Sequence, residues 1–129
     1  MSYKFLEHTS DLIVEAKGKT FRKALEEAAR AMITQMGAEE ASKKEKIKIE
    51  LPSPQTKEDA VVATLTEIIA SCDSEPFTPA EVKISIGKII TVQLSGERKT
   101  PKNIIKAVTY HGLKIERKKD WKITVLFDI

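Results

Sequence analysis

The sequence predicts an α+β fold, in which two main amphipathic helices pack on a mostly antiparallel or mixed β-sheet as a two-layer sandwich. Two segments repeat apolar residues with the helical period, which is typical of helices that bury one face. Several shorter segments alternate apolar and polar residues, which is typical of half-buried strands. A chain of 129 residues has the size of one domain with one core, so we expect a single domain over residues 1–129.

The first helix is expected over residues 20–36. Thr20 is a favourable N-cap, and Gly37 is typical of the residue that ends a helix. Arg22 and Lys23 in the first turn oppose the helix dipole, a small local cost that packing can override. Apolar residues with helical spacing form the expected core stripe: Phe21, Ala24, Leu25, Ala28, Met32, Ile33 and Met36.

The second helix is expected over residues 56–71. Thr56, with Asp59 three residues later, resembles a capping box. The apolar stripe of this helix leads to Cys72, which we interpret as a buried core residue and not as a nucleophile. Because Cys72 is the only cysteine, the sequence also excludes an intrachain disulfide and a cysteine-based zinc cage.

Seven strands are expected from the alternating segments. They are residues 3–6, 11–17, 47–51, 82–86 and 89–94, a segment around 113–115, and residues 121–127. Gly87 and Lys88 suit the tight turn of a β-hairpin, and residues 117–120 connect the last two strands.

Charge is unevenly distributed along the chain. The net charge is +3, but the segment from Arg98 onward holds nine basic and three acidic residues, so it carries +6 and the preceding segment −3. Such a segment suits contact with phosphates or an acidic partner, and a solvated basic loop and strand edge is the alternative. Base-stacking aromatic residues are sparse in it, which argues against a stand-alone platform for single-stranded RNA.

Composition also predicts the compartment. No apolar run approaches the roughly 18 residues that span a bilayer. The first residues lack the apolar core and cleavage site of a signal peptide, and the chain has a single cysteine. We therefore expect a cytoplasmic protein without a membrane partner.

Several kinds of catalytic site are absent from the sequence. It contains neither a GxxxxGK[ST] nor a GxGxxG nucleotide motif, and no serine-centred nucleophile elbow. Its two histidines, His8 and His111, cannot form a histidine-rich zinc site, although a site mixed with carboxylates stays open. A lone histidine beside Tyr110 is more often a hydrogen-bonded structural residue than a base.

Acidic groups at strand ends are more informative. The last strand would hold the Asp128 carboxylate close to the α-carboxylate of Ile129, and Asp11 opens an early strand. If these strands are neighbours, the three groups converge into an all-oxygen site of the kind that Ca²⁺, Mg²⁺ or Mn²⁺ takes. The alternative is a domain that simply ends in a strand.

Motifs at both ends of the chain resemble the archease family. The resemblance spans the whole chain, including its length and the order of its elements. The motifs are FLEHTSD at residues 5–11, GE at 96–97, IKAVTYHGLKI at 105–115, Trp121, and FDI at 127–129.

This resemblance implies a non-catalytic accessory protein of tRNA splicing. Archeases assist the GTP- and metal-dependent RNA ligase of the RtcB class by promoting guanylylation of the ligase histidine and multiple turnover. Phosphates of tRNA or GTP are further expected partners, through the basic C-terminal segment. The resemblance gives Asp11, Asp128 and Ile129 as metal ligands, with Ca²⁺ as the expected cation and Mg²⁺ or Mn²⁺ as alternatives. Three residues of the motifs are further functional candidates: His8, Lys106 and His111.

Two other functions remain open at this point. The first is an RNA-binding or chaperone-like modulator of other tRNA-processing or tRNA-modifying enzymes, which would bind RNA with a steep salt dependence. The second is a metal-dependent hydrolase with Glu7 or His8 as the base, for which the sequence offers no complete catalytic constellation.

Overall fold

The computed structural model describes residues 2–6 and 11–129. Within these residues it contains two α-helices and seven strands, which confirms the predicted α+β class. In chain order the elements are β1 (Ser2–Leu6), β2 (Asp11–Gly18), α1 (Phe21–Met36), the short 3₁₀ helix η1 (Ala38–Glu40), β3 (Glu45–Pro52), α2 (Lys57–Ser74), β4 (Thr78–Ile86), β5 (Ile89–Glu97), β6 (Ala107–Arg117) and β7 (Trp121–Asp128).

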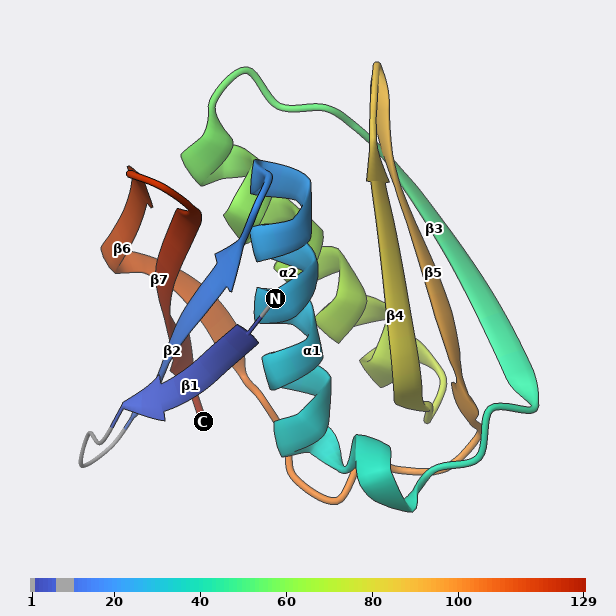
Figure 1. Ribbon diagram of the computed structural model, residues 1–129. Helices are drawn as coiled ribbons and strands as arrows, with labels where there is room; N and C mark the ends of the chain where they lie inside the picture. The colour runs from blue at the N-terminus through green and yellow to red at the C-terminus, as the bar shows by residue number, and fades with distance from the viewer. Residues whose placement is uncertain (1, 7–10) are drawn as a thin grey trace.

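The strands form two sheets instead of one. One sheet has the order β1-β2-β7-β6, the other has the order β3-β5-β4, and every pairing is antiparallel. Both helices lie between the two sheets (Figure 1). The predicted packing of a sheet on two helices is therefore completed by a second sheet on the other side of the helix layer.

Helix α1 is buried on nearly all sides because it contacts both sheets. Thr20 Oγ1 accepts a hydrogen bond from the Lys23 N–H (3.1 Å), and Gly37 ends the helix with φ 116°, as predicted. Small side chains let the helix approach both sheets closely, and its fully buried alanines are Ala24, Ala28, Ala29 and Ala31. The predicted core stripe is confirmed as part of a wider buried surface.

Helix α2 has the predicted start and a buried cysteine near its end. The Thr56 side chain accepts a hydrogen bond from the Asp59 N–H at 3.1 Å. Cys72 is 1% exposed, which confirms its assignment to the core. Burial, with a contribution from the charge of Asp73, raises the pKa of the Cys72 thiol to about 12, so the unreactive thiol form dominates at neutral pH. Among the described residues, no helix has the length and apolar character that crossing a membrane requires.

Two strands start four or more residues earlier than the sequence predicts. Strand β4 begins at Thr78, whose hydroxyl donates to the Lys99 carbonyl (2.9 Å), and its pairing with β5 shifts between Pro79 and Glu81. A proline and a register shift break the alternating pattern, and both are tolerated because β4 is an edge strand. Strand β6 begins at Ala107 and contains a larger irregularity described below.

Side chains of α1 cover part of the open edge of β4. The Ile84 N–H donates to Glu26 Oε2 (2.9 Å), and Arg22 Nη1 donates both to the Ile84 carbonyl (3.1 Å) and to Glu26 Oε2 (3.1 Å). Lys23 Nζ donates to the other carboxylate oxygen of Glu26 (3.1 Å). The first-turn cations of α1 therefore act through Glu26 and β4, which offsets their unfavourable position on the helix dipole.

The Glu26 contacts give a pH-dependent prediction. Burial raises the pKa of Glu26, but the Ile84 N–H and the charges of Lys23 and Arg22 outweigh it, so the pKa lies below its ordinary 4.5. Ionised Glu26 therefore stabilises the fold above about pH 4.5, and this stabilisation is lost as the pH falls through the lowered pKa. We expect Glu26→Gln to cost about 1–2 kcal/mol at pH 7 in urea unfolding, and less at pH 3.

The exposed Glu39 of η1 supplies the control for this prediction. Glu39→Gln should leave the free energy of unfolding within about 0.5 kcal/mol of the wild type at both pH values. A Glu26→Gln penalty of the same size at pH 7 and at pH 3 would contradict the electrostatic explanation.

Candidate functional site

The pairing of β2 with β7 places two carboxylates opposite each other. Asp11 and Asp128 are direct partners in the antiparallel register. Side chains alternate along these strands, and Val14 and Val125 of the opposite parity are fully buried against the helices. Asp11 and Asp128 therefore share the outer face of the sheet, where directly opposed side chains have Cβ atoms about 4.5–5.5 Å apart.

The last residues of the chain are held in place by β6. The Lys106 N–H donates to the Asp128 carbonyl at 2.8 Å, and Ala107 is the register partner of Asp128. Lys106, a sequence-based candidate, thus lies beside the site and fixes its backbone. Ile129 follows directly and is 42% exposed.

The chemistry of these donors fits a hard divalent cation. Two carboxylates directly opposed on neighbouring strands repel each other, and a bound cation converts this repulsion into attraction. Carboxylate oxygens are the ligands that Ca²⁺, Mg²⁺ and Mn²⁺ prefer. Within residues 2–6 and 11–129 no group of three or more His, Cys, Asp or Glu side chains could hold a metal. A cation at Asp11 and Asp128 would therefore need further oxygen donors, such as backbone carbonyl groups, the Ile129 α-carboxylate or water.

The irregular part of β6 carries His111. Thr109 pairs with Leu126 and Lys114 with Thr124, so residues 110–113 lie opposite the single residue Val125. Gly112 has φ 72°, a left-handed conformation that glycine adopts readily. Such bulges re-aim side chains and are frequent beside functional sites. His111 is therefore presented at the surface by a backbone irregularity that the sequence analysis missed, although Gly112 within a strand pattern was a signal for it.

Tyr110 in the same bulge connects β6 to helix α2. Its hydroxyl donates to Asp59 Oδ1 at 2.5 Å. This hydrogen bond, together with the Asp59 charge, raises the pKa of Tyr110. Tyr110 is thus a hydrogen-bonded structural residue of this pair, and no hydrogen bond of the His111 side chain is seen within the part of the chain that the structure describes. His8 lies outside the described residues.

An apolar row lies next to the paired carboxylates on the same outer face. Ile13 is the register partner of both Leu6 and Leu126, and all three side chains are partly exposed. On this face the row lies two residues along β2 and β7 from the pair Asp11 and Asp128. Ile13 shares a face with Asp11 in the predicted strand pattern, but its apolar neighbours come from β1 and β7, and sequence spacing does not reveal them.

The structure divides the basic C-terminal segment into separate surfaces. Arg98 and Lys102 form ion pairs with Glu75 and Glu40, both at 2.9 Å, so these cations are largely engaged. The cations near the β6–β7 turn form a second group around a hollow of about 300 Å³. We name these lysines the basic turn: Lys17, Lys118, Lys119 and Lys122. Two acids, Glu116 and Asp120, line the same hollow.

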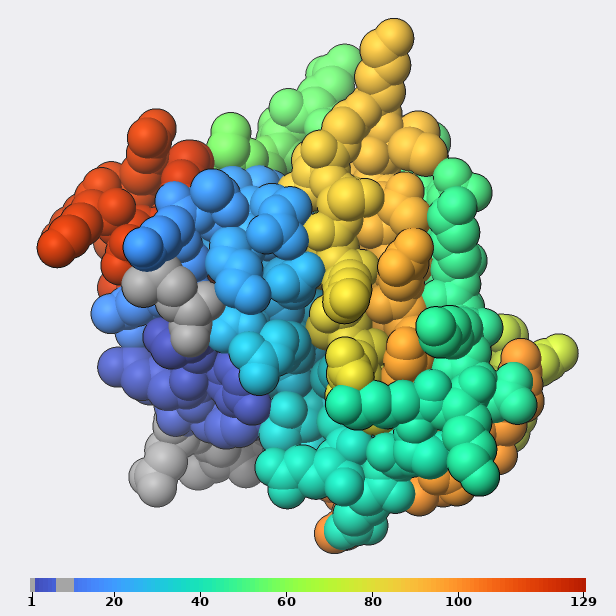
Figure 2. Space-filling model, turned by 45° about the vertical axis from the view of Figure 1, so that its right-hand side comes forward, coloured from blue at the N-terminus to red at the C-terminus, as the bar shows by residue number. Residues whose placement is uncertain are grey.

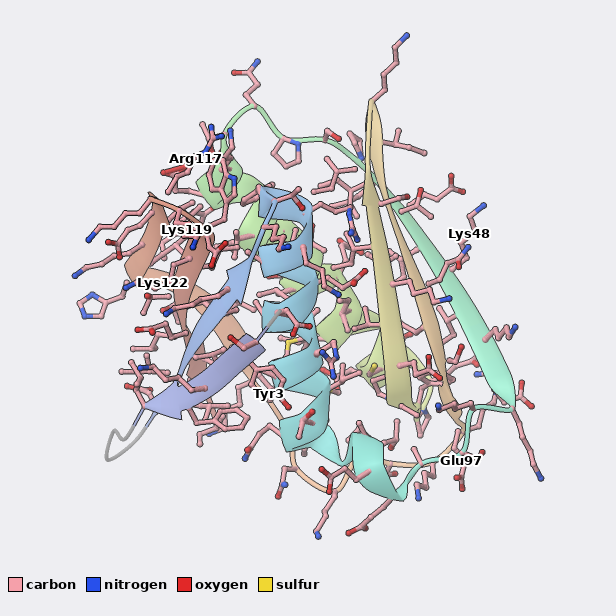
Figure 3. All side chains as sticks on the ribbon, in the orientation of Figure 1. Tyr3, Lys48, Glu97, Arg117, Lys119 and Lys122 are labelled. Carbon is pink, nitrogen blue, oxygen red and sulfur yellow. The ribbon has the colours of Figure 1, made fainter. Side chains whose placement is uncertain are left out.

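The basic turn lies far from Asp128. The two are at opposite ends of β7, whose eight residues span about 25 Å. Figure 3 shows Arg117, Lys119 and Lys122 together at this end of the sheet. The Arg117 guanidinium lies 5.3 Å from the ring centre of Trp121, and Lys57 Nζ lies 5.5 Å from it, so the indole anchors this end.

The chain matches one family model over nearly its whole length. Residues 3–129 match the model of the Archease protein family. Protein archease of Thermotoga maritima is 35% identical over 127 residues, which cover 97% of this chain and 98% of that protein. Protein archease of Pyrococcus furiosus is 29% identical, with 98% of each chain covered.

Two solved structures are similar over the full chain. The crystal structure of a Thermotoga maritima protein described as an archease and possible chaperone has a TM-score of 0.74 and 31% identity, and covers 98% of this chain and 96% of its own. The solution structure of protein 1598 of Methanobacterium thermoautotrophicum has a TM-score of 0.78 with 98% of each chain covered; at 22% identity it shows the shared fold alone.

Proposed function

Because this chain belongs to the archease family, we propose that it acts in the cytoplasm as a non-catalytic accessory protein of an RtcB-class, GTP-dependent RNA ligase in tRNA splicing. Family membership itself supports a chaperone-like or accessory role. The ligase partner, the promotion of guanylylation and the bound cation are our proposal for this chain.

The observation that carries the proposal is the register pairing of Asp11 with Asp128. We assign a divalent cation, Ca²⁺ in the first place, to these two carboxylates and the α-carboxylate of Ile129. When bound, this cation would supply positive charge and open coordination positions for phosphate or carboxylate oxygens of a partner. Lys106 contributes by fixing the Asp128 backbone, and His111 lies on the neighbouring strand as a further contact residue.

The outer face of sheet β1-β2-β7-β6 suits docking of the ligase. The partly exposed row of Leu6, Ile13 and Leu126 lies directly beside the proposed cation site. An apolar centre with charged groups at its border is the usual arrangement of a protein interface. A ligase seated on this row would bring its own active site close to Asp11 and Asp128. In this proposal the basic turn contacts phosphates of tRNA or GTP at the far end of the same sheet.

The test of this proposal is RNA ligation with an RtcB-class ligase at substrate excess. We expect the wild-type chain to raise the number of turnovers per ligase, and Asp11→Ala or Asp128→Ala to remove most of this stimulation. Ligation in a single turnover by pre-guanylylated ligase should be unaffected, because the proposed role precedes that step.

Asp73→Asn is the matched control for the ligation assay. Asp73 is an exposed aspartate near the end of α2, so its loss changes the net charge without touching the paired carboxylates or the basic turn. This variant should stimulate ligation as the wild type does. Full stimulation by both Asp11→Ala and Asp128→Ala would sink the cation-based role.

A chaperone-like role toward other tRNA-processing or tRNA-modifying enzymes is the second candidate. It is favoured by the Thermotoga maritima structure, which is described as a possible chaperone. Such a role predicts that the chain prevents aggregation of a client enzyme without altering ligation. Stimulated ligation together with no effect on client aggregation would exclude it.

A further inference from the structure

The outer face of sheet β3-β5-β4 carries polar side chains in regular cross-strand rows. The register pairs Lys48 with Gln93, and Gln93 with Lys83. The neighbouring row consists of Lys46, Ser95 and Glu81. Inward-facing residues of the same strands are buried against the helices, as Val92 at 0% exposure illustrates. Figure 2 shows β4, β5 and β3 side by side on this flank of the molecule, in yellow, orange and green.

The positive charge on this face is largely unneutralised. A hollow of about 560 Å³ between the rows is lined by four lysines and one glutamate among its charged residues. The glutamate, Glu81, is paired with Lys43 at 2.5 Å. The other three lysines, Lys46, Lys48 and Lys83, form no ion pair among the described residues. Glu81 is also near Lys46 and Lys83, and Glu50 follows Lys48 on the same face of β3. Within the hollow, four lysines still outnumber one glutamate, so an excess of cations is available for an anionic partner.

The spacing of these lysines suits a chain of phosphates. Lys46 and Lys48 are two residues apart on one strand, which separates them by about 6.6–7 Å. Lys48 and Lys83 are separated by two interstrand steps, or about 9.5 Å. Flexible lysine side chains at these separations can reach successive phosphates along one strand, or phosphates on two strands of a helix.

We propose that this face, the lysine face (Lys46, Lys48, Lys83, Gln93 and Ser95), binds the backbone of double-stranded RNA. Its two rows contain no aromatic side chain on which single-stranded bases could stack. They also contain no apolar anchor of the kind that a protein partner requires. Duplex RNA is recognised by shape, through phosphates and 2′-hydroxyls. The lysines supply the phosphate contacts, and Gln93 and Ser95 between them supply hydrogen bonds to 2′-hydroxyls.

The lysine face is separate from the proposed cation site. Lys48 and the basic-turn residues Lys119 and Lys122 lie on opposite flanks of the molecule in Figure 3. The helix layer lies between the two sheets that carry them (Figure 1). One sheet can therefore hold an RNA helix while the other faces a protein. This RNA contact requires no ligase and goes beyond the accessory role proposed above.

Binding of a blunt RNA duplex to the full chain, measured by fluorescence anisotropy over a range of salt concentrations, tests the proposal. We expect Lys48→Gln/Lys83→Gln to weaken binding roughly five- to tenfold at low salt. The plot of log K against log salt should become shallower by about 1.8, because two phosphate contacts at roughly 0.9 each are lost. Both lysines are exposed, so the variant should unfold at the same urea concentration as the wild type.

Lys19→Gln/Lys114→Gln makes the same change in net charge at two exposed lysines outside both the lysine face and the basic turn, and is the matched control. It should retain at least half of the wild-type affinity for the RNA duplex. Duplex DNA of the same sequence and single-stranded RNA should bind more weakly than duplex RNA. Equal weakening by the two double variants, or tighter binding of single-stranded RNA or of polyglutamate, would overturn the proposal.

Discussion

Replacing Gly96 with alanine is expected to lower the free energy of unfolding by about 3 kcal/mol, at the upper end of the usual cost of overpacking. A Cβ atom at this position would lie 2.3 Å from the Thr78 carbonyl oxygen and 2.8 Å from ring carbons of Phe77. Phe77 is fully buried, and Thr78 is held by β5 and by Lys99, so neither group can move cheaply. Urea unfolding monitored by circular dichroism measures the loss.

Gly87 supplies the matched control in the adjoining hairpin. A Cβ atom there would meet nothing closer than the Ile89 carbonyl at 3.9 Å, and Gly87 does not have a positive φ. Gly87→Ala should therefore stay within about 0.5 kcal/mol of the wild type. If Gly96→Ala were as stable as Gly87→Ala, the close approach of β4 to β5 at this point would be wrong.

The second large effect concerns the stabilisation that a cation gives. A ligand that binds only the folded chain stabilises it by about 2.7 kcal/mol at a concentration of 100 times its Kd. We expect Ca²⁺ to raise the free energy of unfolding of the wild type in this way. Asp128→Asn should show no such rise, because it removes one of the two carboxylates that face each other across β2 and β7.

The same titration has an internal control at the other end of the strand. Asp120→Asn should be stabilised by Ca²⁺ as much as the wild type, because Asp120 lies in the β6–β7 turn. A rise in stability that is equal in the wild type, Asp120→Asn and Asp128→Asn would mean that Ca²⁺ acts elsewhere on the chain. Mg²⁺ and Mn²⁺ in parallel titrations identify the preferred cation.

Local features of the fold were predictable from the sequence. Thr20 and Gly37 mark the two ends of α1. These ends were predictable because a capping hydrogen bond and a left-handed glycine involve only residues that are adjacent in the sequence. Gly87 and Lys88 form the predicted turn for the same reason. The division of the strands into two sheets was not predictable in this way. Strands of either sheet show the same alternation, and the choice of partner depends on contacts between residues far apart in the chain.

The part of the candidate site that follows from the alternation of side chains along a strand was predictable. Asp11 and Asp128 were expected to approach if their strands were neighbours, and β2 and β7 are neighbours with these residues in register. The Tyr110–His111 bulge depends on a three-dimensional irregularity, and the lysine face combines residues from β3, β4 and β5. The basic segment after Arg98 was treated as one surface, but ion pairs with distant acids such as Glu40 and Glu75 divide it.

Calorimetric titration of the full chain with Ca²⁺ is the most direct test of the cation site that we propose at Asp11 and Asp128. The predicted result is one cation bound per chain, with binding lost in Asp11→Asn and in Asp128→Asn and retained in Asp120→Asn. Absence of binding to the wild type, or binding with the same affinity in all four proteins, would exclude a cation site at these two carboxylates.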